Sequence, residues 1–212
     1  MDQTNLNRKE HWENIYQTKD LKDVSWYQST PTTSLAFVKE LNLSFTAKII
    51  DVGGGDSFFV DCLLKLGYRN ITVLDISKRA IEKAKKRLGN KAEKVKWIIA
   101  DAANFYPTEK YDFWHDRAAF HFLISQSDVK KYINTTVNHI VEEGVMVIGT
   151  FSVGGPKKCS GVDIQQYSKT SMTQLFHPYF EKIKCKSVNH ETPFNTVQHF
   201  TFCSFKRMKM LY

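Results

Sequence analysis

Short apolar runs alternate with amphipathic stretches along the chain after about residue 45. The apolar runs are rich in β-branched residues and predict strands at Ala47–Val52, Ile71–Asp75, Val95–Ala100, Tyr111–His115 and Gly144–Phe151. Stretches with apolar positions three or four residues apart predict helices at Phe58–Leu66, Lys78–Leu88, Gln126–His139 and Ser171–Phe176. Because strands alternate with helices, the pattern indicates βαβ units and an α/β protein with a mostly parallel sheet.

The end of the chain shows a different pattern. Two strand-like runs are joined by a short turn around Pro193 and Asn195, which predicts an antiparallel hairpin. Lysines at every second position of the first run are typical of an edge strand. The second run carries Phe200 and Phe202 on one face and further apolar residues on the other, so we expect it inside the sheet, covered on both sides.

The part of the chain before this α/β region is polar but contains several aromatic residues. A helical pattern runs roughly from Asn7 to Tyr16, followed by a loop. We expect a single domain over residues 1–212, with a helical leader and lid in 1–45 and the α/β core in 46–212.

Composition adds limits on class and location. The chain has 212 residues, of which 42% are hydrophobic, enough for one domain with a sizeable core. No apolar run approaches the length of about 18 residues that a membrane span needs, and the N-terminus has no apolar signal region. The four cysteines lie far apart and are expected to be free thiols, which fits a reducing cytoplasm better than a disulfide framework or a zinc site. We therefore expect a cytoplasmic protein without a membrane partner.

The formal net charge is +8, and much of the excess lies between Ser77 and Lys96. A basic helix can bind nucleic acid. Here an apolar stripe at helical spacing predicts instead that the lysines form the solvated face of a packed helix, and no aromatic residues alternate with them to stack on bases. Nucleic acid is therefore not the expected partner.

Three glycines follow the first predicted strand in the segment DVGGGDS, Asp51 to Ser57. Such a turn allows positive φ values or close approach of a ligand to the backbone. A dinucleotide-binding loop would place a third glycine at Phe58, and a P-loop would continue with Gly-Lys-Ser or Gly-Lys-Thr, so both are excluded. The turn predicts a nucleoside ligand without a pyrophosphate.

Aspartates stand at the ends of the first three predicted strands: Asp51, Asp75 and Asp101. Open α/β sheets bind ligands at this edge, and an acid at the end of the second strand can accept hydrogen bonds from ribose hydroxyls. Asp101 could accept a hydrogen bond from an adenine amine while the backbone of Ala102 contacts the ring. Each aspartate alone could equally be a helix N-cap, but all three beside the glycine turn favour a ligand site.

The segments DVGGGDS, LDIS and ADAANF resemble the first three cofactor motifs of class I S-adenosylmethionine-dependent methyltransferases. The resemblance covers nearly the whole chain, since the closing hairpin also matches that family. It implies a three-layer Rossmann-like α/β fold with a seven-stranded, mostly parallel sheet of order 3-2-1-4-5-7-6 and an antiparallel last strand. One departure is Ser57, where many members have a further glycine.

The same resemblance implies which residues hold S-adenosylmethionine. The acid and glycines of the first motif would contact the methionyl part, the second motif the ribose and the third the adenine. In similar proteins, aromatic residues of the leader lie near the methionyl end. The implied cofactor-binding residues are Tyr16, Trp26, Tyr27, Asp51, Gly53, Gly54, Gly55, Asp75, Ile76, Asp101, Ala102 and His115.

The segment after the fourth predicted strand, HDRAAFHFL, would run beside the transferable methyl group. We predict His115, Asp116 and His121 as catalytic residues that face the acceptor. Two alternatives stay open: Asp116 and Arg117 could form a structural ion pair, and His121 could satisfy a buried hydrogen bond. No metal is expected, because no carboxylate or cysteine joins the histidines at ligand spacing.

The leading hypothesis is transfer of a methyl group to an N, O or S atom of a small-molecule acceptor. Methylation of a protein lysine is the alternative, because the leader and the segment HDRAAF are similar to those of eukaryotic lysine methyltransferases of this fold. A third hypothesis is a non-catalytic nucleoside-binding protein. Nucleic-acid methylation is disfavoured, since no Asn-Pro-Pro-Tyr or Asp-Pro-Pro-Tyr segment follows the fourth strand. An NAD-dependent oxidoreductase is disfavoured by Phe58.

Overall fold

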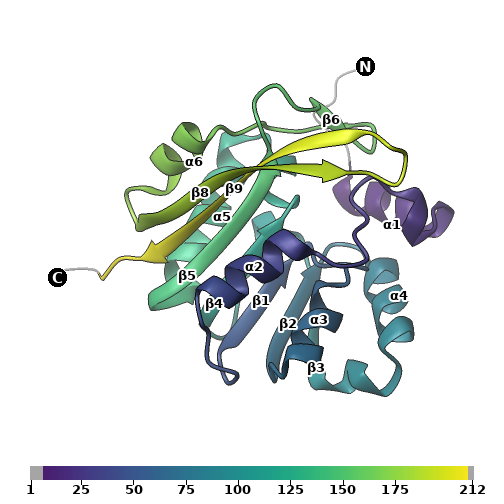
Figure 1. Ribbon diagram of the computed structural model, residues 1–212, viewed down its shortest axis with the longest axis horizontal. Coiled ribbons are helices and arrows are strands. Elements are labelled where there is room, and N and C mark those ends of the chain that lie inside the picture. Colours follow the sequence, from purple (N-terminus) through teal and green to yellow (C-terminus); the bar gives the residue numbers. More distant parts are fainter. Residues whose placement is uncertain (1–6, 210–212) are drawn as a thin grey trace.

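A computed structural model describes residues 7–209 of the protein. Its centre is a seven-stranded sheet of order β3-β2-β1-β4-β5-β9-β8 (Figure 1). The strands are β1 Lys48–Val52, β2 Asn70–Asp75, β3 Val95–Ile99, β4 Tyr111–Arg117, β5 Ile140–Phe151, β8 Phe180–Glu191 and β9 Val197–Arg207. The first five are parallel, and β9 runs antiparallel between β5 and β8. The predicted strand order and the antiparallel end of the sheet are confirmed.

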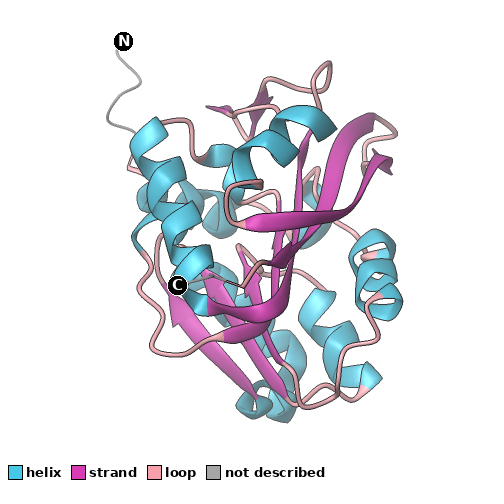
Figure 2. Ribbon diagram, turned by 90° about the vertical axis from the view of Figure 1, so that its left-hand side faces the viewer, coloured by secondary structure: helices cyan, strands magenta, loops and turns pink. Residues whose placement is uncertain are grey.

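Helices cover both faces of the sheet, which gives three layers (Figure 2). They are α1 Arg8–Thr18, α2 Thr32–Glu40, α3 Phe59–Leu66, α4 Lys78–Leu88, α5 Gln126–His139 and α6 Lys169–Phe176. Apolar residues of α2, α3 and α4 share one core with one face of the sheet, and those of α5 and α6 share a second core with the other. α1 lies beside α4 and the free end of the β8–β9 hairpin (Figure 1).

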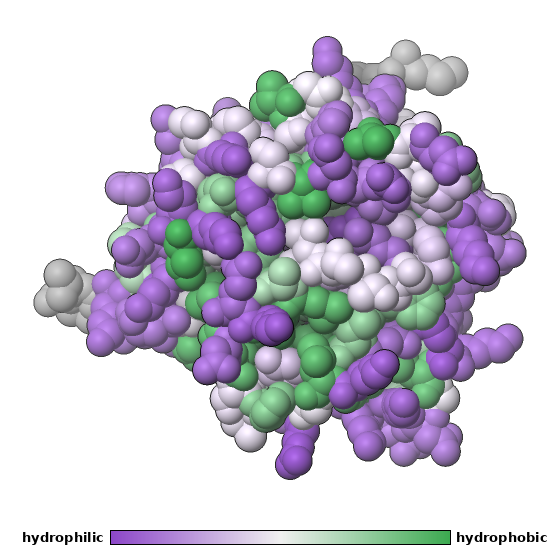
Figure 3. Space-filling model, viewed as in Figure 1, coloured by the Kyte–Doolittle hydropathy of each residue, from purple (hydrophilic) through white to green (hydrophobic). Residues whose placement is uncertain are grey.

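The basic helix α4 is packed as expected. It begins after Ser77, whose side chain accepts a hydrogen bond from the backbone N–H of Ala80, and its buried residues are Ala80, Ile81, Ala84 and Leu88. The lysines between these positions are exposed or half-buried. Figure 3 shows hydrophilic residues over much of the visible face, while apolar residues gather in its lower half, near α2 and α3. None of the helices in residues 7–209 is long and apolar enough to cross a membrane.

Three features differ from the sequence prediction. Helix α2 was not expected, because Pro31 and two threonines at its start are typical of a loop. Its residues Phe37 and Val38 pack on the sheet, and this burial outweighs their weak helix propensity. Strand β5 begins at Ile140, directly after α5, and not at Gly144. The polar loop after β5 contains two short strands, β6 Lys158–Cys159 and β7 Val162–Asp163.

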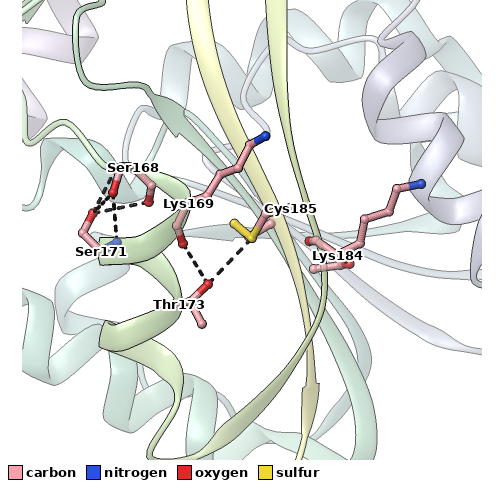
Figure 4. Close-up of a disulfide and its surroundings, with 8 residues drawn as sticks. Ser168, Lys169, Ser171, Thr173, Lys184 and Cys185 are labelled. Atoms are coloured by element: carbon pink, nitrogen blue, oxygen red, sulfur yellow. Dashed lines mark hydrogen bonds between the residues drawn. A yellow bond between two sulfur atoms is a disulfide. The ribbon is translucent and has the colours of Figure 1, made fainter.

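The expectation of four free thiols is wrong, because Cys185 and Cys203 form a disulfide (Figure 4). The two cysteines are directly opposed in the β8–β9 ladder, a neighbourhood that their spacing in the sequence does not reveal. The hydroxyl of Thr173 in α6 lies 3.9 Å from the sulfur of Cys185. Cys62 and Cys159 are free.

Candidate active site

A cavity of about 760 Å³, open mouth included, lies where the first four strands end. The ends of strands β1, β2 and β3 form the floor of the cavity, and the segment after β4 forms one wall. Helix α1 and the loop after it lie over this floor. The lining residues are Arg8, Trp12, Tyr16, Trp26, Gly53, Leu74, Asp75, Ile76, Ala100, Asp101, Ala102, Arg117, Ala118, Ala119, Phe122, Leu123 and Cys159.

The turn after β1 consists of glycines because neighbouring side chains leave no room for Cβ atoms there. Gly53 and Gly55 have φ values of +67° and +39°, which favour glycine. A Cβ atom at Gly53 would lie 2.5 Å from the Cβ of Ala119, and one at Gly55 would lie 2.7 Å from Oδ2 of Asp75. Gly53 lines the cavity, whereas Gly54 and Gly55 lie outside its lining. The turn thus brings main-chain atoms to the cavity between β2 and the segment after β4.

Asp75 lies at the end of β2 and lines the cavity although only 5% of its surface is exposed. Its Oδ1 accepts a hydrogen bond of 2.8 Å from the backbone N–H of Ser77. Burial, together with the nearby charges of Asp51 and Glu13, raises the pKa of this carboxyl to about 7, partly offset by the hydrogen bonds it accepts. Asp75 is therefore a carboxyl whose charge depends on a pH near neutrality.

Asp101, at the end of β3, is bonded to helix α1. Its Oδ2 accepts a hydrogen bond of 2.8 Å from Nη2 of Arg8, and its Oδ1 one of 2.9 Å from the backbone N–H of Ala103. Arg8 also pairs with Asp128 at 2.8 Å. No sequence motif marked Arg8 as a site residue, because its two acidic partners lie about a hundred residues away along the chain.

Aromatic residues of the N-terminal segment close the cavity. The Trp12 ring lies 5.7 Å from that of Trp26 and 5.0 Å from that of Phe122, and the Tyr16 ring lies 6.3 Å from Trp26. All four residues line the cavity. Tyr27, which was predicted with them, does not: its ring lies against that of Phe58, 6.1 Å away.

Several known proteins with this architecture are methyltransferases. A family model described as a methyltransferase domain matches residues 49–144. The chain is 24% identical over 193 residues to EEF1A lysine methyltransferase 2 of Danio rerio, across 84% of this chain and 77% of that relative. It is 29% identical over 92 residues to malonyl-(acyl-carrier protein) O-methyltransferase 1 of Ilyobacter polytropus, across 43% of this chain and 34% of the relative.

The 1,6-didemethyltoxoflavin-N1-methyltransferase of Burkholderia thailandensis, crystallised with 1,6-didemethyltoxoflavin and S-adenosylhomocysteine, has a similar fold. The TM-score is 0.75 at 16% identity, over 95% of this chain and 87% of that chain. Residues 49–144 thus match a methyltransferase domain, and the chain shares the fold of S-adenosylmethionine-dependent methyltransferases, as the three motifs indicated.

The described residues of this methyltransferase fit S-adenosylmethionine. Gly53 brings main-chain atoms to the cavity at a position where a Cβ would clash with Ala119, and a carboxyl stands at the end of β2 where a ribose would lie. Ile76 and Ala102 line the cavity beside the two acids. In residues 7–209 no group of three or more histidines, cysteines or acids is arranged to hold a metal ion.

His115 and Asp51 lie beneath the glycine turn and do not line the cavity of the methyltransferase. The two residues are neighbours in the β1–β4 ladder, and Nδ1 of His115 lies 2.7 Å from Oδ1 of Asp51. Nε2 of His115 lies 2.8 Å from Oγ of Ser34 in α2. With both ring nitrogens engaged in the core, His115 ties β1, β4 and α2 together and does not face an acceptor.

Asp116 is fully buried on the opposite face of β4. It accepts hydrogen bonds from the backbone N–H groups of Ala119 and Phe120 and one of 2.7 Å from the Tyr132 hydroxyl. Burial raises its pKa to about 6, and these hydrogen bonds limit the rise. Asp116 shapes the turn after β4 and lies outside the cavity lining. The alternative of an ion pair with Arg117 does not occur, since Arg117 lines the cavity instead.

His121 is also fully buried and outside the cavity lining. Its Nδ1 accepts a hydrogen bond of 3.2 Å from the backbone N–H of Phe151, which agrees with the alternative of a buried structural histidine. Burial, with the charge of Arg117, lowers its pKa to about 3, so the ring is neutral. The three predicted catalytic residues are therefore not brought together at the cavity.

Two residues of the cavity wall, Arg117 and Cys159, were not among the predicted site residues. The guanidinium of Arg117 donates a hydrogen bond of 3.0 Å to the carbonyl of Trp26 and stacks over Phe200 at 5.2 Å. Burial raises the pKa of the Cys159 thiol to about 11, so this cysteine is protonated and unsuited to act as a nucleophile.

Proposed function

We propose that the protein transfers a methyl group from S-adenosylmethionine to an N, O or S atom of a small-molecule acceptor. The observation that carries this proposal is the aromatic cover of the cavity: Trp12, Trp26 and Phe122 pack against one another over the end that would hold the acceptor, which leaves little room for a folded macromolecule. The names of two of the similar proteins contain a small acceptor group, which is a malonyl group in one and a toxoflavin precursor in the other.

The cofactor would lie along the ends of the strands. Asp101 and Ala102 would contact the adenine, Asp75 and Ile76 the ribose, and Gly53 the methionyl part. When bound, S-adenosylmethionine supplies a methyl group on a positively charged sulfur. Gly54 and Gly55 would complete the turn, and Asp51 would support it from beneath. Helix α1 and the loop after it would act as the lid.

The chain's own contribution to the reaction is placement and exclusion of water. The lid residues Trp12, Tyr16 and Trp26 would hold the acceptor in line with the methyl group, and such orientation alone can supply several kcal/mol of barrier lowering. In the transfer, a lone pair of the acceptor forms the new bond to carbon and the carbon–sulfur electrons pass to sulfur. A proton on the acceptor would leave to solvent, since no histidine or ionised carboxyl lies at the acceptor end of the lining.

Protein lysine methylation is the second candidate. It is favoured by the similarity to EEF1A lysine methyltransferase 2, which covers 84% of this chain. The aromatic lining of the cavity could also accept an extended side chain.

Methyl transfer from radiolabelled S-adenosylmethionine into a cell lysate tests the proposal. We expect label in small-molecule products, separated from unreacted S-adenosylmethionine, when wild-type protein is added, and none with Asp75→Ala. Label confined to the protein fraction would favour the lysine candidate. An absence of label in every fraction, with cofactor binding retained, would favour the non-catalytic hypothesis.

A further inference from the structure

Arg117 is a half-buried cation at the cavity, and one of its hydrogen-bond donors is buried and unused. One of its two terminal nitrogens donates to the Trp26 carbonyl, while Nη2 is buried and has no partner. In residues 7–209 no carboxylate oxygen lies within 4.0 Å of the guanidinium. Arg8, the other arginine of the lining, is paired with two aspartates. A buried charge is costly unless it is paired, so Arg117 has the character of a receptor for an anion.

The register of the sheet places Arg117 on the side of Gly53 that faces away from Asp75. Val52 pairs with Leu74 on one side and with Asp116 on the other, so Asp75 and Arg117 leave the sheet on opposite sides of Gly53. Asp101 lies still further away, after β3. With strands spaced by about 5 Å, the backbones of Asp75 and Arg117 are roughly 10 Å apart. An adenosine over β2 and β3 and a methionyl group over β1 leave the end of β4 for the acceptor.

Charge balance also favours an anion there. Bound S-adenosylmethionine has a positive sulfonium close to its methyl group, and Arg117 adds a second positive charge. The acid whose charge acts on Arg117 is Asp51, which lies beneath the turn and is hydrogen-bonded to His115. A carboxylate on the acceptor would neutralise the guanidinium, accept from Nη2 and lie beside the aromatic rings of the lid.

We propose that Arg117 binds a carboxylate of the methyl acceptor, so that the substrate is a small organic acid. This inference rests on the proposed function and makes its substrate class specific. A single free terminal nitrogen suits a monoanionic carboxylate better than a phosphate, whose three oxygens require more donors. A lysine side chain is disfavoured, because its ammonium group would approach the unpaired guanidinium and the sulfonium together.

The test uses full-length protein saturated with S-adenosylhomocysteine and titrated with benzoate, benzamide or benzylamine. We expect benzoate to bind about tenfold more tightly than the neutral or the cationic analogue, because of the charge-assisted hydrogen bond. Arg117→Gln should remove this preference, and the matched surface variant Arg69→Gln should keep it. Arg117→Lys, which keeps the charge, should retain part of it. Equal binding of the three probes to wild type, or a preference unchanged in Arg117→Gln, would overturn the inference.

A second pair of ligands tells an acceptor carboxylate from the carboxylate of the cofactor. S-adenosylhomocysteine has the amino acid moiety, whereas 5′-methylthioadenosine lacks it. We expect Arg117→Gln to change the dissociation constants of both S-adenosylhomocysteine and 5′-methylthioadenosine by less than about threefold. A large loss for S-adenosylhomocysteine alone would assign Arg117 to the cofactor and overturn the inference. If wild-type protein fails to bind S-adenosylhomocysteine at all, the proposed function itself fails.

Discussion

Asp75 and Asp116 are both buried carboxyls with raised pKa values, yet their surroundings give them different tasks. Asp75 lines the cavity and has one oxygen free of protein partners, so it can accept hydrogen bonds from a ligand. Asp116 uses both oxygens inside the protein, on two backbone N–H groups and a tyrosine hydroxyl. A pKa shift alone would not separate the two, whereas the contacts do.

The pKa of Asp75, about 7, predicts that cofactor affinity depends on pH. Only the ionised carboxyl accepts two hydrogen bonds from ribose hydroxyls, and it becomes ionised as the pH rises through 7. We expect the affinity for S-adenosylhomocysteine to increase roughly tenfold between pH 6 and pH 8, measured by calorimetry. Asp75→Asn, which stays neutral, should bind more weakly and without this dependence. A wild-type affinity that is flat with pH would contradict the role given to Asp75.

The buried hydrogen bonds of Asp116 predict that its removal lowers the stability of the protein. Asp116→Ala would leave the O–H donor of Tyr132 and two backbone N–H groups without an acceptor in the core, so we expect the free energy of unfolding to fall by about 3 kcal/mol. Urea unfolding measures it. Asp112→Ala, on the same strand but less buried, is the control and should cost less. A fully stable Asp116→Ala protein that binds cofactor but transfers no methyl group would restore the catalytic assignment.

At the scale of elements, helix α1 is fastened at two points. Arg8 pairs with Asp101 and Asp128. Glu13 accepts hydrogen bonds at the start of α4, from the Ser77 hydroxyl and from the backbone N–H groups of Lys78 and Arg79. A negative charge at a helix N-terminus is favourable, so this contact stabilises both helices. Ionic contacts thus hold helix α1 over the cluster of aromatic side chains described above.

This arrangement predicts that Arg8 controls the lid. Arg8→Gln removes two charge-assisted pairs that are about three-quarters buried, so amide exchange in α1 should become faster and the affinity for S-adenosylhomocysteine should fall several-fold. Hydrogen–deuterium exchange followed by mass spectrometry measures the first effect. Lys9→Gln, an exposed neighbour, is the control and should behave like wild type. Unchanged exchange in α1 of Arg8→Gln would mean that the pairs do not hold it.

Prediction of the elements succeeded where the pattern was long and periodic. The five parallel strands and the helices α3, α4 and α5 lie within a few residues of their expected bounds. Helix α2 was missed because its local sequence favours a loop and only contact with the sheet makes it helical. Site prediction followed the same rule. Residues of continuous motifs, such as Asp75, Ile76 and Asp101, line the cavity, whereas Arg8 and Arg117 depend on partners that are distant in sequence.

At the scale of the whole molecule, the disulfide joins the two strands that close the sheet. The bond between Cys185 and Cys203 spans 18 residues, and closing a loop of this size restricts the unfolded chain. We expect reduction, or Cys185→Ser, to lower the free energy of unfolding by about 3 kcal/mol. Cys62→Ser, which changes a free thiol, should be nearly neutral. Because neither cysteine of the disulfide lines the cavity, cofactor affinity should be unchanged. Equal stability with and without reductant would show that the bond does not form.

The strand order was implied by the resemblance to class I methyltransferases, while the pattern of the last two runs predicted the antiparallel hairpin. All parallel strands end at one edge, and this topology brings residues of β2, β3 and β4 together around the bare turn of Gly53. The central claim is that this edge holds an adenosine without a pyrophosphate.

Calorimetric titration with S-adenosylmethionine, S-adenosylhomocysteine and NAD tests this claim most directly, on wild type and on Asp75→Ala. We predict micromolar binding of the first two ligands, a loss of at least about tenfold in the variant and no binding of NAD, because the turn offers no site for a pyrophosphate. NAD bound as tightly as S-adenosylmethionine, or an Asp75→Ala protein with unchanged affinity, would contradict it.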